Sequence, residues 1–216
     1  LFKTWYVLLN KDNFTTPKGK SKTEAILSDI RIDQENIGKK FYKVYREARI
    51  SLLRDIIEQN QIKHKELDLA IEKAQKIIDR IVFTAFAEDR GLLPDDTLQR
   101  IIKVADNSEL GISLWDTLKS VFNAIDHGSD KLDIPNGYNG GLFKHDDALN
   151  NLHIGDDVLR KVVELGTYNF SEDLSVNILG HIFEQSISDI EEIKNKVNES
   201  QSLGTISQSR RKKDGI

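Results

Sequence analysis

Two stretches of the chain carry apolar residues at three- and four-residue spacing, and this helical period limits the fold more than any other feature. Each stretch places its apolar side chains on one face, which a helix buries against a neighbour. The sequence therefore predicts a mainly α-helical, irregular multi-helix domain. The two stripes consist of Ile37, Phe41, Val44, Tyr45, Ala48, Leu52 and Ile56, and of Ala74, Ile77, Ile78, Ile81, Val82, Ala85 and Phe86.

Signals for helix starts and stops divide the rest of the chain into further helices. Gly91 follows the second stripe as a stop signal, and Pro94 with two acids suits the start of the next helix. Ser113 is a candidate N-cap. Two more helices are expected near 157–165 and 173–197, after a long stretch rich in Gly, Asn and Asp. In total, about six helices are predicted.

The first 14 residues, LFKTWYVLLNKDNF, are aromatic and aliphatic with a short polar end. We interpret them as one strand, the edge of a sheet whose other strands precede Leu1. Because a single strand does not fold alone, we expect the chain to be part of a longer protein. TTPKGKSKTEA, which follows, has the composition of a linker. The 216 residues include no methionine, which leaves open whether modified methionines are missing from the sequence.

Composition excludes several classes of protein. The chain has no cysteine, so it holds no disulfide scaffold, Cys-ligated zinc or cysteine nucleophile, as is typical of the reducing cytoplasm. No apolar run approaches the roughly 20 residues of a membrane span, and no signal peptide is visible. We therefore expect a cytoplasmic protein without membrane contact.

Positive charge gathers in two places, although the formal net charge is −4. One place is the polar face of the predicted helix between 39 and 54, and the other is the RRKK run at 210–213. Such patches are candidates for sequence-independent contact with DNA phosphates, while a solvated face is the ordinary alternative. The candidate contacts are Lys39, Lys40, Lys43, Arg46, Arg49, Arg54, Arg210, Arg211, Lys212 and Lys213.

No catalytic, cofactor-binding or metal-binding set emerges from the sequence. His145, Asp146 and Asp147 could act together, but hydrogen-bonding loop residues are the ordinary interpretation. The acids of AEDRG at 87–91 are similarly typical of an ion pair that ends a helix. NGYNGG at 136–141 lacks the lysine and hydroxyl of a phosphate-binding loop, and turns with positive φ explain its composition.

Four segments occur in an order that carries more information than any of them alone. They are FYKVYREARISLLRDI (41–56), IIDRIVFTAFAEDRGLLP (77–94), IPNGYNGGLF (134–143), and ILGHIFEQSI (178–187) with RRKKDGI (210–216). Together they resemble the single-chain restriction–modification enzymes of type IIG and related adenine-specific DNA methyltransferases. That family has a Phe-Ala-Glu-Asp-x-Gly helix end, an Asn-Gly-Gly-Leu-Phe element and an Arg-Arg-Lys-x-x-Gly segment that enters the methyltransferase domain.

The resemblance implies a division into three parts. Residues 1–34 would end an upstream nuclease-like domain with its linker, 35–200 would form a helical connector, and 201–216 would be a basic exit segment before a methyltransferase domain. The connector would position the two domains and could contact the DNA backbone. For the parent protein the resemblance implies a bacterial, cytoplasmic adenine methyltransferase of phage defence, with or without nuclease activity.

The family's catalytic motifs are absent from these residues, so this part is expected to be inactive and to hold no cofactor. S-adenosylmethionine and Mg²⁺ are implied for the parent alone, with double-stranded DNA and the neighbouring domains as partners. The alternative is a purely structural or partner-binding helical module with no DNA contact. An enzyme that uses His145, Asp146 and Asp147 would have to show activity or metal binding by itself.

Overall fold

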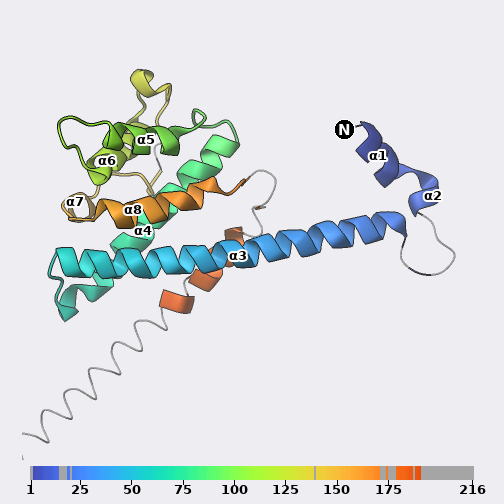
Figure 1. Cartoon of the computed structure of the whole chain (residues 1–216), viewed down its shortest axis with the longest axis horizontal. Coiled ribbons are helices and arrows are strands. Elements are labelled where there is room, and N and C mark those ends of the chain that lie inside the picture. The colour runs from blue at the N-terminus through green and yellow to red at the C-terminus, as the bar shows by residue number, and fades with distance from the viewer. Residues whose placement is uncertain are drawn as a thin grey trace, which may run out of the picture.

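The computed structural model describes residues 2–14, 19, 21–138, 140–170, 174, 179–186 and 188–190. Over these residues the chain is helical, with an isolated bridge between Ser129 and Ile134 and no sheet (Figure 1). The predicted mainly α fold is confirmed. The α-helices are α1 Phe2–Leu9, α2 Lys11–Phe14, α3 Lys22–Gln59, α4 Leu67–Asp89, α5 Thr97–Asp106, α6 Leu114–His127, α7 Asp147–Asn150 and α8 Asp156–Val163. The 3-10 helices are η1 His64–Glu66, η2 Asp130–Leu132 and η3 Glu164–Thr167, and residues 179–186 and 188–190 are also helical.

The longest element, α3, has 38 residues and is therefore about 57 Å long. It begins at Lys22, whereas the helical period predicted a start near 35. A capping box explains the earlier start. The Ser21 Oγ accepts the Glu24 N–H at 3.1 Å, and the Glu24 carboxylate accepts the Ser21 N–H at 2.8 Å. The stretch interpreted as a linker thus contains the signal that starts the helix.

The two halves of α3 have different surroundings. From Phe41 onward its apolar stripe lies in the core, where Phe41 and Leu52 are fully buried. From 24 to 36 no residue of α3 is buried. This half extends away from the other helices and carries α1 and α2 at its far end (Figure 1). We call the described residues up to 36 the N-terminal arm, and the described residues from 37 onward the body.

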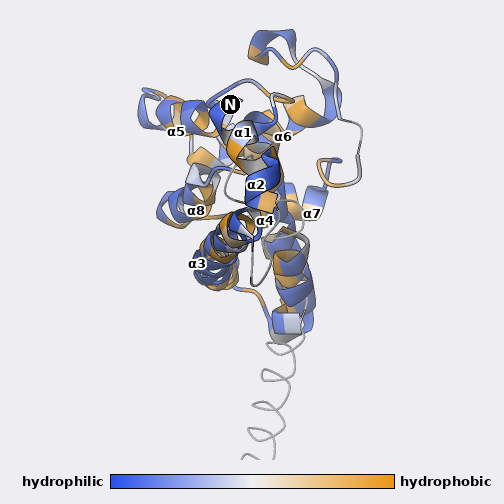
Figure 2. Ribbon diagram, turned by 90° about the vertical axis from the view of Figure 1, so that its right-hand side faces the viewer, coloured by the Kyte–Doolittle hydropathy of each residue, from blue (hydrophilic) through white to orange (hydrophobic). Residues whose placement is uncertain are grey.

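The body is built around α4, which packs against α3, α5, α8 and η3. Its apolar residues Ile77, Ile78 and Ile81 are fully buried, and two charged residues of α4, Lys73 and Arg80, are buried with them. In Figure 2, which looks nearly along α3, α5 and α8 lie on one side of α3. A helix enclosed on so many sides has little surface left for charge, so its charged residues need partners inside the fold.

The predicted N-terminal strand is wrong, because residues 2–14 form α1 and α2. The Asn10 N–H donates to the Tyr6 carbonyl at 3.0 Å, and the Phe14 N–H donates to the Asn10 carbonyl at 3.2 Å. A short apolar run is compatible with either a strand or a helix. No sheet exists among the described residues to pair with a strand, whereas a helix satisfies its backbone groups locally.

Several predicted helix ends are confirmed. The Ser113 Oγ accepts the Asp116 N–H at 3.0 Å and caps α6. Gly91 follows α4 with a φ of 67°, a left-handed conformation that favours glycine. The helix expected near 157–165 is α8. Of the helix expected over 173–197, residues 179–186 and 188–190 are helical, and the remaining positions except Leu174 lie outside the described residues.

Candidate nucleic-acid interface

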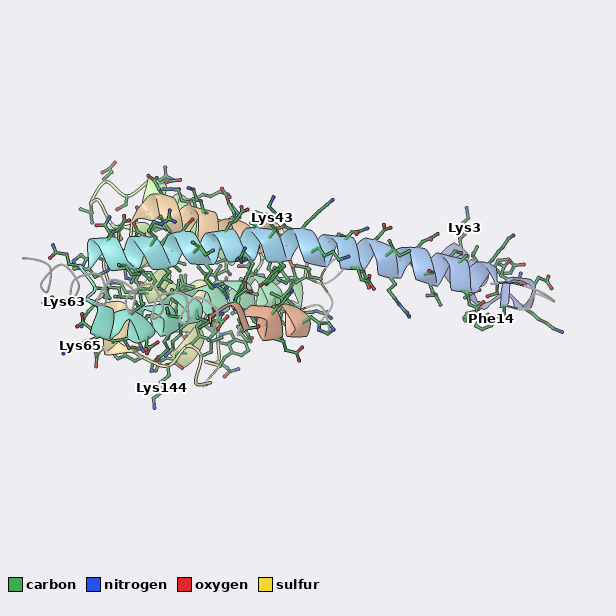
Figure 3. The ribbon with its side chains drawn as sticks, turned by 90° about the horizontal axis from the view of Figure 1, so that it is seen from below. Lys3, Phe14, Lys43, Lys63, Lys65 and Lys144 are labelled. Carbon is green, nitrogen blue, oxygen red and sulfur yellow. The ribbon has the colours of Figure 1, made fainter. Side chains whose placement is uncertain are left out.

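The polar side of α3 presents five of the six cations predicted on this helix to solvent. One acid, Glu47, lies between the first and the last of them in the sequence. The span from Lys39 to Arg54 is about 22 Å, over which one DNA strand carries about six phosphates. In Figure 3, Lys43 lies on the opposite side of the molecule from Lys144. The exposed cations, which we call the basic face, are Lys39, Lys40, Lys43, Arg46 and Arg54.

Arg49 is not part of the basic face, contrary to the prediction from its position between exposed cations. It is 3% exposed. It follows Tyr45 by four positions and so lies on the same side of α3 as this buried residue. The Arg49 Nη1 donates to the Ser186 carbonyl at 3.0 Å and to the Ser186 hydroxyl, and the Nη2 donates to Asp189 at 3.2 Å. Arg49 therefore stabilises the fold and is unavailable to DNA.

Asp189 accepts hydrogen bonds from three side chains of α3. The donors are the Tyr42 hydroxyl at 2.5 Å, the Arg46 Nε at 3.2 Å and the Arg49 Nη2 at 3.2 Å. Burial, together with the hydrogen bond to Asp189, raises the pKa of Tyr42 to about 12, so the hydroxyl keeps its proton at neutral pH. These bonds hold the helical residues 179–186 and 188–190, which we call the strap, against α3.

A second layer of hydrogen bonds joins the strap to α4. The Ser186 hydroxyl donates to the Gln75 Oε1 at 3.2 Å and lies 3.3 Å from the Tyr45 hydroxyl. The Gln75 amide donates to the Tyr45 hydroxyl at 2.6 Å and to Asp79 at 2.7 Å. Three elements that are distant in the sequence thus share one polar network. The four basic residues predicted at 210–213 lie outside the described residues.

The acids of AEDRG are structural caps. The Glu88 carboxylate accepts the Leu98 N–H at 2.7 Å and so caps α5, whose own N-cap residue makes no side-chain bond. The Asp89 carboxylate accepts the Phe170 N–H at 2.6 Å. Burial raises the pKa of Glu88 to about 7, and the nearby Asp89 and Asp96 add to the shift. The motif therefore joins α4 to two later segments and brings no acid–base pair to a cleft.

Arg80 binds the segment that contains NGGLF. Its Nε donates to the Leu142 carbonyl at 2.8 Å, and its Nη2 donates to the Lys144 carbonyl at 2.9 Å. The guanidinium lies 5.3 Å from the ring centroid of Phe122 and 5.8 Å from that of Phe143. Arg80 is 2% exposed and therefore lies deep in the body. Its two hydrogen bonds fix the irregular segment to this position.

Gly137 in NGYNGG is required for close approach, and not for the positive φ expected from the sequence. A Cβ at this position would lie 2.1 Å from the Asp126 carbonyl oxygen near the end of α6. The neighbouring Tyr138 N–H donates to the Ile125 carbonyl at 2.7 Å. The glycine thus lets the loop backbone pack directly on α6, as at other close backbone contacts.

The KHDD residues are divided between structural roles. Asp146 caps α7 through the Leu149 N–H at 3.0 Å, and it forms ion pairs with Lys73 and Lys76, each at 2.9 Å. Burial alone would raise the pKa of Asp146, but the lysine hydrogen bonds outweigh it and lower the pKa. His145 forms an exposed pair with Asp147 at 2.9 Å. Within the described parts of the chain, no group of three His, Cys, Asp or Glu residues could hold a metal ion.

Sequence reasoning missed the buried charges of α4. Lys73 and Arg80 are buried and lie beside or within the apolar stripe of residues 74–86, and Asp79 next to Arg80 is half-buried. A signal was present, because the apolar residues of this stretch surround much of the helix and leave little polar surface. Charges on such a helix are expected to be buried and paired.

A curated protein of Methanocaldococcus jannaschii is similar to part of this chain. Its name is "Putative type II restriction enzyme and methyltransferase", and the two sequences are 28% identical over 138 residues. The similarity covers 52% of this chain, which spans 12% of that protein's own length. No protein-family model matches the chain, and no solved structure matches it. The similarity supports a relationship to restriction–modification enzymes.

None of the described helices is both long enough and apolar enough to cross a membrane.

Proposed function

We propose that this chain is a non-catalytic helical spacer of a restriction–modification enzyme, which positions a nuclease-like and an adenine methyltransferase domain and contacts the DNA backbone. The proposal rests on the similarity to the Methanocaldococcus jannaschii protein and on the order of motifs in the sequence. Both parent domains, their S-adenosylmethionine and Mg²⁺, and a cytoplasmic role in phage defence belong to the proposal. The parent protein, of which this chain would be a part, is proposed to bind double-stranded DNA.

The observation that carries the spacer role is the length of α3 beyond the body. The half of α3 beyond the body buries little surface, so packing within the body does not explain its length. A role in connecting two domains would explain it. The N-terminal arm exposes large apolar residues: Tyr6 is 62% exposed, Phe14 57% and Ile32 52%. Apolar residues gathered at one end favour packing against another protein domain.

The basic face supports the DNA contact independently of the spacer role. Its cations lie on the outer side of the half of α3 that the body holds in place. Contacts of this kind bind phosphates without reading bases, so sequence recognition would lie elsewhere in the parent. The expected binding is weak and depends strongly on salt.

A salt titration of duplex binding tests the DNA contact. Lys39→Gln, Lys40→Gln and Lys43→Gln are combined in one variant, and Arg46 is kept because it pairs with Asp189. Fluorescence anisotropy with a labelled duplex should show weaker binding by this variant. The slope of log affinity against log salt should decrease by roughly 0.9 for each lost phosphate contact. A second variant replaces Arg210, Arg211, Lys212 and Lys213 by Gln.

The matched control removes three exposed lysines elsewhere, by Lys63→Gln, Lys65→Gln and Lys144→Gln. This variant has the same net charge as the first one, so it separates a local contact from general attraction. Equal losses in the two triple variants, or an unchanged slope in the basic-face and 210–213 variants, would refute the DNA contact.

A structural or partner-binding module without DNA contact is the second candidate. The exposed apolar residues of the N-terminal arm favour it, because they need no nucleic acid to explain them. This candidate is correct if the chain fails to bind duplex DNA at low salt and forms a stable complex with a protein domain.

A further inference from the structure

A cavity of about 470 Å³ lies between α4 and the strap. It is lined by Phe83 and Phe86 of α4, by Leu179 and Phe183 of the strap, and by Leu142. Its volume falls in the range of about 300–1,000 Å³ that is usual for small-molecule sites. The three phenylalanines of the lining are half-buried.

Among the described residues that line this cavity, Asp79 is the only one with a polar side chain. Its Oδ1 accepts a hydrogen bond from Gln75 at 2.7 Å, and its second oxygen accepts none within the described parts of the chain. The positive charge of Arg49 lowers the pKa of Asp79, but no hydrogen bond joins these two side chains among the described residues. Asp79 is therefore the polar side chain of an otherwise apolar lining, and one of its two oxygens has no donor among the described residues.

The charge of Asp79 is poorly compensated in the protein as it stands. Burial raises the pKa of Asp79 to about 6, although the Gln75 hydrogen bond and the charge of Arg49 both oppose the shift. Ionisation at neutral pH thus costs free energy that the fold does not recover. A bound positive charge would recover it. A perturbed acid in a cavity is a common feature of binding sites.

We propose that this cavity binds a small organic cation with an apolar body and a single ammonium head. The head would donate to the second oxygen of Asp79, and the body would contact Phe83, Phe86 and Phe183. Aromatic rings attract organic cations through their negative faces, which adds to the attraction of the carboxylate. A carboxylate ligand would be repelled, and a neutral ligand would gain only from the apolar walls. The proposal is independent of the DNA contact.

The test compares three probes of the same shape. They are 2-phenylethylammonium, neutral 2-phenylethanol and anionic phenylacetate, titrated into the isotope-labelled whole chain and followed by NMR chemical shifts. The ammonium probe should bind most tightly and shift residues of α4 and the strap. Asp79→Asn should weaken its binding by about 10- to 100-fold, the usual effect of losing a charged hydrogen bond, and leave 2-phenylethanol unaffected.

Asp147→Asn is the matched control, because it removes one acid whose side chain is 90% exposed and lies outside the cavity lining. It should leave ammonium binding unchanged. The proposal is overturned if the three probes bind equally, if none binds, or if Asp79→Asn and Asp147→Asn have the same effect. A melting curve of each variant, together with unchanged 2-phenylethanol binding, separates loss of the site from loss of the fold.

Discussion

At the scale of single residues, the charges buried in this chain act as connections between segments. Arg80 donates hydrogen bonds to two carbonyls of an irregular segment. Asp146 pairs with two lysines of α4, and Glu88 caps α5, the next helix in the chain. Each group would be costly to bury alone, so its partners decide its effect on stability. The motifs that resemble restriction–modification enzymes are therefore built from structural residues in this part of the protein.

Replacement of Arg80 should destabilise the body. In Arg80→Met the apolar volume is nearly kept, but the Leu142 and Lys144 carbonyls lose their donor. We expect a loss of about 2–4 kcal/mol in the free energy of unfolding, measured by urea denaturation. Arg160→Met, which removes a solvent-exposed pair with Asp106, should destabilise the chain much less than Arg80→Met does. Equal effects of the two replacements would contradict the role given to Arg80.

Glu88 should make stability depend on pH. Its pKa is about 7 in the folded chain, against 4.5 as its ordinary value, so the folded state holds the proton more strongly. The contribution of Glu88 to stability therefore falls as pH rises from about 4.5 to about 7. Glu88→Gln keeps an acceptor for the Leu98 N–H without the charge. The full shift in pKa corresponds to about 3 kcal/mol. Solvent around the partly exposed carboxyl group reduces this, so at pH 8 the free energy of unfolding of the variant should exceed that of the wild type by roughly 2 kcal/mol, and at pH 4 the two should agree.

Urea denaturation of both proteins at several pH values measures this difference. Asp79 titrates in an overlapping range, but its effect cancels when the variant is compared with the wild type at each pH. Glu88→Ala is the control for the cap, and it should lose about 1 kcal/mol relative to Glu88→Gln at every pH. Parallel stability curves for wild type and Glu88→Gln would show that Glu88 does not titrate in this range.

At the scale of elements, α3 combines two environments in one helix. Its C-terminal part is held by the core and the strap, while the N-terminal arm has its own capping box and a small contact with α2 through Thr23. A spacer has to keep its length, so the arm should stay helical and aligned with the body. The absence of cysteine from the chain makes this alignment measurable with introduced labels.

Electron–electron distance measurements should give one narrow distribution of distances between a spin label on the N-terminal arm and a spin label on the body. The labels are placed by Asp29→Cys on the arm and Lys103→Cys on α5, both exposed positions. Insertion of a short glycine stretch after Asp33 should broaden the distribution, because glycine weakens a helix interior. A pair at Lys103→Cys and Lys144→Cys, both in the body, should stay narrow in either chain. A broad distribution across the arm without the insertion would refute a rigid spacer.

At the scale of the whole molecule, the candidate contact surfaces are separate. The basic face lies on the outer side of α3, the cavity lies between α4 and the strap, and exposed apolar residues gather on the N-terminal arm. The strap joins the helix of the basic face to the cavity. Its Asp189 pairs with Arg46 and Arg49 of α3, and its Phe183 lines the cavity. Binding in the cavity and the position of the strap are therefore expected to depend on each other.

The helical class of the fold, most helix ends and the apolar stripes of the core could be predicted from the order of the amino acids. These features depend on interactions within a few residues, such as the Ser113 cap and the spacing of Phe41 and Tyr45, so a single sequence is sufficient to predict them. The signal that starts α3 was also local, although the linker composition around Ser21 obscured it.

The tertiary structure alone decided which charges face water and which are buried. Arg49 and Asp189 are 140 positions apart, and no short-range pattern predicts their pairing. The same holds for Asp79, because residues of the strap complete the lining of the cavity to which it belongs. For the first residues, a helix prevailed over a strand because no sheet within the described chain was present to pair with them. The burial of a charge is a property of contacts between distant segments, and only the folded chain defines it.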